Sequence, residues 1–150
     1  MPTVMTTNRT ERTVRMILID TSVIIGYLKG NKSDKVLLLH EILERKAPYG
    51  ISAFTYQEVL QGARDEAEWE TLHEYLSTQE IYYLTPVVDT FKKGARLYYD
   101  LRRSGITPRS TIDLLIVLTA LEHELALLHD DRDFDLIADH ISGLRVLEQF

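Results

Sequence analysis

Short apolar runs alternate with longer amphipathic stretches along this chain, and that alternation constrains the fold more than any other feature. The strand-like runs are residues 16–20, 49–53, 81–84, 125–128 and 144–147. The helix-like stretches are residues 22–28, 33–46, 55–63, 67–76, 88–103, 110–124 and 134–139. Strands that alternate with helices are typical of a parallel sheet covered on both faces. We therefore expect one α/β domain with a central parallel sheet of four to five strands.

Length and composition agree with a single domain. The chain has 150 residues, of which 45% are hydrophobic, enough for one packed core. Residues 1–15 are polar and lack apolar periodicity, so we expect a flexible N-terminal extension before a domain at residues 16–150. Cysteine is absent, which excludes disulfides and thiolate metal sites and fits a cytoplasmic protein. The apolar runs are too short to span a bilayer, so no membrane partner is expected.

The charge of the chain limits how it can interact with nucleic acid. The formal net charge is −6, which argues against a protein that binds nucleic acid by bulk charge alone. It does not argue against an enzyme that acts on nucleic acid. Carboxylates gathered in one site lower the net charge, and a bound metal ion reverses the local sign.

Four acidic residues lie where apolar segments begin or end. Asp20 closes the first strand-like run and Asp131 follows the fourth, whereas Glu58 and Asp113 lie near helix beginnings. Ligand sites in parallel sheets lie beyond the carboxyl ends of the strands, so we expect the four side chains to meet at one edge. Converging carboxylates suit a hard divalent cation. This is the chemistry of a metal-dependent phosphodiesterase.

Each acid also has an ordinary structural interpretation. Asp20 can cap the helix that follows it, and Glu58 can face solvent. Asp113 can complete a capping box with Ser110, and Asp131 can be a turn or cap residue. The metal-site hypothesis therefore depends on the joint placement of the four acids and not on any one of them.

Four segments, taken in order and spacing, resemble a known family. They are IDTSV at 19–23, SAFTYQEVLQG at 52–62, IDLLIVLTA at 112–120 and LHDDRDF at 128–134. Together they resemble PIN-domain ribonucleases and, among these, the VapC-type toxins of prokaryotic toxin–antitoxin pairs. The resemblance covers residues 16 to about 150. It implies a three-layer α/β/α PIN-like domain.

The resemblance implies a site and partners. Asp20, Glu58, Asp113 and Asp131 would be the catalytic residues of an endoribonuclease and would hold Mg²⁺ or Mn²⁺. VapC-type proteins typically form homodimers and bind a small VapB-like antitoxin, which blocks the acidic site with a basic side chain. RNA would be the substrate.

In one place the chain departs from the family pattern. The family usually has Thr or Ser two residues before the fourth acid, and here His129 stands there. His129 can either touch the site, since it lies two residues from Asp131, or simply end the strand, and we favour the strand-end interpretation. Asp133 is a candidate additional metal ligand, and Thr21 or Ser22 are candidate supporting hydroxyls from the opposite side.

Basic and aromatic side chains suggest further contacts. Arg109 borders the expected site and is the best candidate for RNA phosphate binding. Three other arginines precede the Asp113 helix and can equally bind phosphate or lie on a solvated helix face. They are Arg96, Arg102 and Arg103. Five large apolar or aromatic side chains of the two middle helices can either line a groove for a peptide or pack in the core. They are Tyr56, Leu60, Trp69, Leu72 and Tyr75.

Two other functional classes stay open. One is a non-catalytic PIN-like module that acts only by binding a protein partner. The other is a phosphoryl-transfer enzyme that uses Asp20 as the nucleophile. The second is disfavoured, since Asp20 is followed by Thr21-Ser22 and the fourth strand leads to acids and not to a lysine.

Overall fold

Five parallel strands form the centre of the fold. The computed structural model describes residues 16–149, so the expected extension at residues 1–15 lies outside the described residues. The strands are β1 (Ile17–Ile19), β2 (Tyr49–Ser52), β3 (Ile81–Tyr82), β4 (Ala126–Leu128) and β5 (Arg145–Val146). Their order is β3-β2-β1-β4-β5, and each neighbouring pair is parallel. The predicted parallel sheet of four to five strands is confirmed.

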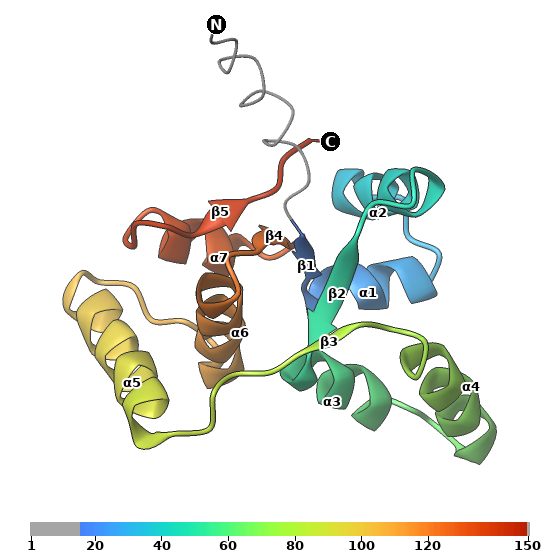
Figure 1. Ribbon diagram of the computed structural model, residues 1–150, viewed down its shortest axis with the longest axis horizontal. Coiled ribbons are helices and arrows are strands. Elements are labelled where there is room, and N and C mark those ends of the chain that lie inside the picture. Colours follow the sequence, from blue (N-terminus) through green and yellow to red (C-terminus); the bar gives the residue numbers. More distant parts are fainter. Residues whose placement is uncertain (1–15, 150) are drawn as a thin grey trace, which may run out of the picture.

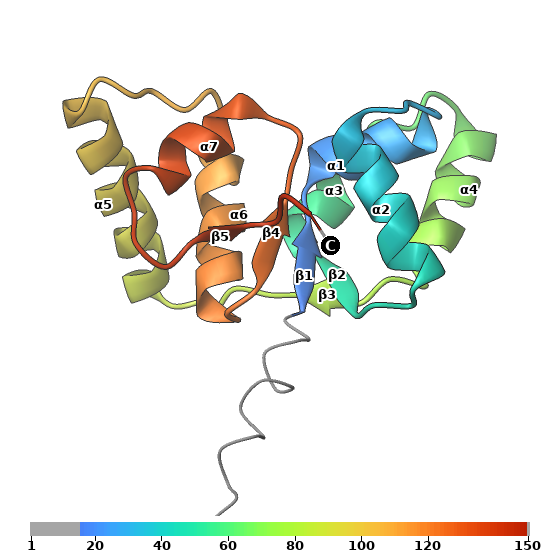
Figure 2. The same ribbon diagram turned by 90° about the horizontal axis from the view of Figure 1, so that it is seen from above.

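Helices cover both faces of this sheet. They are α1 (Thr21–Leu28), α2 (Asp34–Glu44), α3 (Ala53–Gln61), α4 (Glu66–Leu76), α5 (Val88–Arg103), α6 (Thr111–Glu122) and α7 (Arg132–Ala138). Helices α1 to α4 lie on one side and α5 to α7 on the other (Figures 1 and 2). None of the helices within residues 16–149 has the length and apolar character needed to cross a lipid bilayer.

The alternation of side chains along β1 joins two separate cores. Ile17 and Ile19 are buried in a cluster with α1 to α4, whereas Leu18 is buried in a cluster with α5 to α7. Successive strand side chains point to opposite faces, so one three-residue strand serves both cores. The three-layer α/β/α architecture predicted from the sequence is confirmed.

Several boundaries differ from the sequence prediction. The edge strands are shorter, with β3 ending at Tyr82 and β5 limited to Arg145–Val146. Helix α3 begins at Ala53, two residues early, because the Ser52 hydroxyl accepts a hydrogen bond from the Thr55 N–H at 3.0 Å and caps the helix. Helix α7 begins at Arg132 because Asp131 caps it.

Strands β2 and β3 approach closely at Gly50. A Cβ atom there would lie 2.6 Å from the Tyr82 ring and 2.7 Å from the Glu80 carbonyl oxygen. Only glycine leaves room for this approach. This pairing fixes β2 in the sheet up to its last residue, Ser52, and α3 begins at the next residue.

The strand order changes direction at β1. From β1 the chain passes to β2 on one side and reaches β4 on the other. In open parallel sheets, ligands typically bind beyond the carboxyl ends of the strands at such a point. The Asp20 N–H donates to the Leu128 carbonyl at 2.9 Å and joins the two strand ends.

Candidate metal centre

Three carboxylates gather at this edge of the sheet. Asp113 lies in the first turn of α6, Asp131 caps α7, and Asp133 lies in the first turn of α7. One oxygen from each lies within 4.8 Å of the others, and all three residues are partly exposed. The alternative capping box of α6 does not form, since the Ser110 hydroxyl caps the helix by accepting from the Ile112 N–H at 3.1 Å and Asp113 makes no hydrogen bond back to Ser110. The Asp113 carboxylate is left free.

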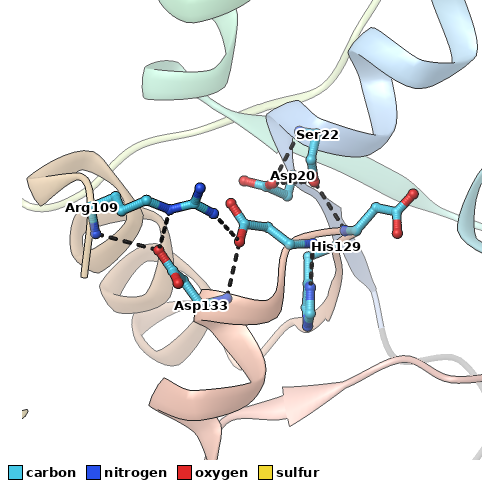
Figure 3. A network of polar contacts seen from close by, with 7 residues as sticks. Asp20, Ser22, Arg109, His129 and Asp133 are labelled. Atoms are coloured by element: carbon cyan, nitrogen blue, oxygen red, sulfur yellow. Dashed lines mark hydrogen bonds and ion pairs between the residues drawn. The ribbon is translucent and has the colours of Figure 1, made fainter. Parts of the chain in front are cut away.

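Asp20 is the most buried of the acids, with only 3% of its surface exposed. Its Oδ2 accepts hydrogen bonds from the Ser22 N–H at 3.0 Å and the Ser22 hydroxyl at 2.6 Å. Ser22 Oγ in turn accepts from the Asp130 N–H at 3.0 Å, which joins α1 to the loop after β4 (Figure 3). Burial raises the pKa of Asp20, and the Ser22 hydrogen bonds oppose that rise. Asp20 therefore caps α1 and also lies at the carboxyl edge.

Glu58 is held by a line of hydroxyl groups. The Thr21 hydroxyl donates to Glu58 Oε1 at 2.7 Å, so its oxygen accepts from Thr55, whose Oγ1 lies 3.0 Å away. Thr55 is fully buried and lies 3.2 Å from Ser52 Oγ. Thr21 is a candidate supporting hydroxyl from the sequence, whereas Ser52 and Thr55 have no role at the site assigned from the sequence. The available signal was the spacing of three residues from Ser52 to Thr55 and from Thr55 to Glu58.

The charge around Asp113 ties the five acids together. Within residues 16–149 its carboxylate makes no hydrogen bond or ion pair. Burial, together with the repulsion of nearby carboxylates, raises the pKa of Asp113 to about 7. In decreasing order of effect these neighbours are Asp20, Asp131, Glu58 and Asp133. The other three acids named from the sequence, and Asp133, thus all lie within electrostatic reach of Asp113.

Arg109 is the counter-ion of two of these acids. Its Nη2 lies 3.2 Å from Asp131 Oδ1 and its Nε 3.2 Å from Asp133 Oδ2 (Figure 3). Its backbone N–H also donates to Asp133 Oδ2 at 3.3 Å. The two carboxylates raise the pKa of Arg109, chiefly through Asp133. The guanidinium is largely exposed, so it is also open to an RNA phosphate, and that role stays a prediction.

His129 contacts the site, which is the less favoured of the two interpretations drawn from the sequence. The side chain is buried and its Nδ1 accepts a hydrogen bond from the Asp131 N–H at 3.2 Å. Only its position two residues before Asp131 pointed to this contact.

The other candidate side chains lie elsewhere. Three arginines of α5 stack on tyrosines of the same helix, Arg96 and Arg103 on Tyr99 and Arg102 on Tyr98. In the proposed groove, Trp69 is exposed and Leu60 is buried. The remaining members pack against the core beside α1 to α4; they are Tyr56, Leu72 and Tyr75. Core packing accounts for most of this set.

The donor set suits a hard divalent cation. Every candidate ligand is a carboxylate oxygen, and the nearby groups that hold the carboxylates are hydroxyls, backbone amides and the Arg109 guanidinium. Magnesium and manganese prefer such oxygen ligands together with water. The raised pKa of Asp113 means that a cation bound there would remove an unfavourable cluster of like charges.

Comparisons with known proteins agree with this arrangement. A family model described as "PIN domain" matches residues 17–140. The VapC ribonuclease Mb1587 of Mycobacterium bovis is 33% identical over 124 residues, which cover 82% of this chain and 92% of the relative. Ribonuclease VapC11 of Mycobacterium tuberculosis gives the same values. The structure of VapBC2 from Rickettsia felis, bound to a promoter DNA fragment, has a TM-score of 0.66 at 20% identity and covers 90% of this chain and 98% of that one.

Proposed function

The chain belongs to the PIN-domain family, and from that premise we propose that it is a metal-dependent endoribonuclease, the toxin of a VapBC-type toxin–antitoxin pair. The observation that carries the proposal is the meeting of Asp113, Asp131 and Asp133 within 4.8 Å at the carboxyl edge of the sheet. Relatives named as VapC ribonucleases, similar over most of their length, support the same activity.

We assign the metal to the acids at this edge. Asp113, Asp131 and Asp133 would contribute oxygens directly, and Asp20 and Glu58 would act directly or through water. A divalent cation is the cofactor expected for this family, and we propose Mg²⁺ or Mn²⁺. When bound, such a cation lowers the pKa of a coordinated water and stabilises negative charge on the scissile phosphate and the leaving oxygen.

The protein's own residues prepare the site in two ways. Hydroxyl groups fix two of the carboxylates, since Ser22 holds Asp20 and Thr21 holds Glu58. Asp113 stays free of hydrogen bonds, so its oxygens are available to a ligand. Arg109 partly neutralises the acid pair and would be displaced or shared when a phosphate and a cation arrive. Water as the nucleophile predicts RNA fragments with 5′-phosphate and 3′-hydroxyl ends.

The phosphoryl-transfer alternative fits the geometry poorly. A nucleophilic aspartate needs an accessible oxygen, but Asp20 is only 3% exposed and its Oδ2 accepts two hydrogen bonds from Ser22. A non-catalytic binding module does not require four acids to share one charged edge. Both alternatives are separated from a nuclease by the same assay.

The test is cleavage of total cellular RNA by the purified protein without antitoxin. Reactions contain Mg²⁺, Mn²⁺ or chelator, beside Asp20→Asn and Asp113→Asn variants and the matched control Asp130→Asn. Asp130 is an exposed acid in the same loop, outside the three-carboxylate set. Discrete fragments that require metal and both site acids, but not Asp130, are expected. Folded protein that cleaves no RNA pool with either metal would sink the nuclease proposal.

The proposed partner is a VapB-like antitoxin, with a homodimer of this chain in the complex. The Arg109 contacts reveal that a guanidinium fits between Asp131 and Asp133. An arginine supplied by an antitoxin could take that place and exclude the metal. We expect the free protein to elute at twice the 17.3 kDa of one chain in size-exclusion chromatography with light scattering. A monomer that is not inhibited by the co-encoded small protein would contradict both parts. We also propose that the protein acts in the cytoplasm, where cellular RNA is its substrate.

A further inference from the structure

His129 is a buried polar side chain that the proposed chemistry leaves without a role. Only 2% of it is exposed, at the end of β4. Its ring lies against Phe134, with centroids 5.0 Å apart and planes tilted by 38°. Burying an imidazole is costly unless its nitrogens are matched by partners. The two ring nitrogens of His129 have different surroundings.

The Nδ1 atom faces the acidic edge. The Asp131 backbone N–H donates to it at 3.2 Å (Figure 3). A ring nitrogen that accepts a hydrogen bond carries no proton, so the neutral ring holds its proton on Nε2. Nε2 lies 3.2 Å from Asp135 Oδ1 but is not aligned for a hydrogen bond, and it has no other partner within residues 16–149. The ring thus holds the loop after β4 through Nδ1 and contacts α7 by packing on Phe134.

Asp131 is fixed from two sides by these contacts. Its Oδ1 accepts from the Asp133 N–H at 3.0 Å, while its own N–H donates to His129. The cap bond controls the side chain, and the imidazole bond controls the backbone from which that side chain projects. Without Nδ1, the peptide before Asp131 loses its partner and can rotate. The carboxylates of both Asp131 and Asp133 would then lose their common orientation.

The geometry points to His129 as a positioning residue for the metal centre. Its Nδ1 sets the direction in which Asp131 and Asp133 present their oxygens to a divalent cation. This inference rests on the proposed function, because it needs a metal at those acids. Hydrogen bonds that orient metal-binding groups typically change metal affinity by about 10–100-fold when they are removed.

Two substitutions separate positioning from packing. In His129→Asn, the side-chain oxygen can occupy the place of Nδ1 and accept from the amide two residues on. In His129→Gln, the longer amide reaches toward Asp135 and leaves the Asp131 N–H unmatched. Both variants lose the ring contact with Phe134, so both should lower Tm by a similar amount. Thermal unfolding of metal-free protein measures that shared loss.

The deciding measurement is Mn²⁺ affinity by isothermal titration calorimetry, without RNA. We expect His129→Gln to bind Mn²⁺ about 10–100-fold more weakly than the unchanged protein. His129→Asn should bind it nearly as well as the unchanged protein. Equal affinities for the two variants would overturn the positioning role. If the unchanged protein binds no Mn²⁺, the proposed function fails together with this inference, which is a different result from failure of His129 alone.

A second measurement needs no variant. Long-range ¹H–¹⁵N NMR spectra of the unchanged, metal-free protein identify the protonated nitrogen of each imidazole. The positioning role requires the proton of His129 on Nε2 and a bare Nδ1. A signal from protonated Nδ1 would exclude the hydrogen bond from Asp131 and overturn the inference, even if both variants failed to fold.

Discussion

Asp113→Asn should make the metal-free protein more stable while it removes activity. The free carboxylate of Asp113 is partly buried beside four other acids, and burial with their repulsion raises its pKa to about 7. Asparagine has nearly the same shape but no charge. The substitution therefore removes a repulsive, poorly solvated charge without opening a cavity.

The size of the effect follows from the pKa. A rise from the ordinary value of 3.8 to about 7 corresponds to at most about 4 kcal/mol of lost stability. The site is open to water at one side, and solvent screening reduces that figure to about 1–2 kcal/mol. For a chain of this length, we expect the variant's Tm to rise by about 2–8 °C at pH 8.

The pH dependence of stability separately tests whether Asp113→Asn stabilises the metal-free protein. The folded pKa of Asp113 lies above its unfolded value, so the folded state binds the proton more tightly. Protonation of Asp113 therefore favours folding at low pH, and this advantage is lost as the pH rises through about 7. The gain from Asp113→Asn should be complete above pH 7, shrink below it and disappear near pH 4.

Thermal unfolding in chelator, followed by circular dichroism at several pH values, measures the gain. The control is Asp130→Asn, which removes an exposed charge from the same edge. Its Tm should change little. Added Mn²⁺ should stabilise the unchanged protein and the Asp130→Asn control, since both retain the Asp113 carboxylate that binds the metal. It should not stabilise Asp113→Asn. A variant that is less stable than the unchanged protein at pH 8 without metal would refute the reasoning.

Three further predictions test neighbouring parts of the site. Arg109→Gln should weaken RNA binding and reduce its salt slope by about one, measured by fluorescence anisotropy on the metal-free protein; the exposed Arg64→Gln should change neither. Thr21→Val should lower Mn²⁺ affinity by about 10–100-fold in calorimetry because Glu58 loses its 2.7 Å hydrogen bond, whereas Thr21→Ser should retain it. Mn²⁺ affinity should fall below about pH 7, where a proton competes at Asp113, and affinity that stays flat from pH 8 to pH 5.5 would contradict this.

The order and faces of the elements could be predicted because they depend on local pattern. Apolar runs marked all five strands, and a strand such as β4 (Ala126–Leu128) has no polar side to expose. The predicted edge strands are longer than the observed ones, because the apolar residues continue beyond those that pair with the neighbouring strand. Ile81 and Tyr82 pair with β2, whereas Tyr83 turns outward and is exposed. Pairing depends on the neighbouring strand, which a local pattern does not contain.

The candidate site could be predicted only in part. The four acids could be assigned to one edge because the carboxyl ends of parallel strands coincide. The contacts that hold the acids depend on side-chain directions in three dimensions. Thr55 reaches Thr21, and His129 turns back to an amide two residues ahead. The spacing of Thr55 and Glu58 indicates a shared helix face but not the contact with Thr21, and the strand-end interpretation of His129 does not include the hydrogen bond that its ring accepts from the Asp131 N–H.

Two of the acids serve folding and the site at once, which explains why both interpretations of them were reasonable. Asp20 caps α1 and Asp131 caps α7, each through a hydrogen bond to an N–H two residues on. An asparagine can make the same cap, because its side-chain oxygen accepts equally. Neutralisation at these positions should therefore separate the two roles, retaining the helix starts and removing the charge. The same reasoning does not extend to Asp113, whose carboxylate makes no cap and whose ionised form destabilises the metal-free fold. A residue with that cost and no structural partner among residues 16–149 is best explained by a ligand that brings positive charge.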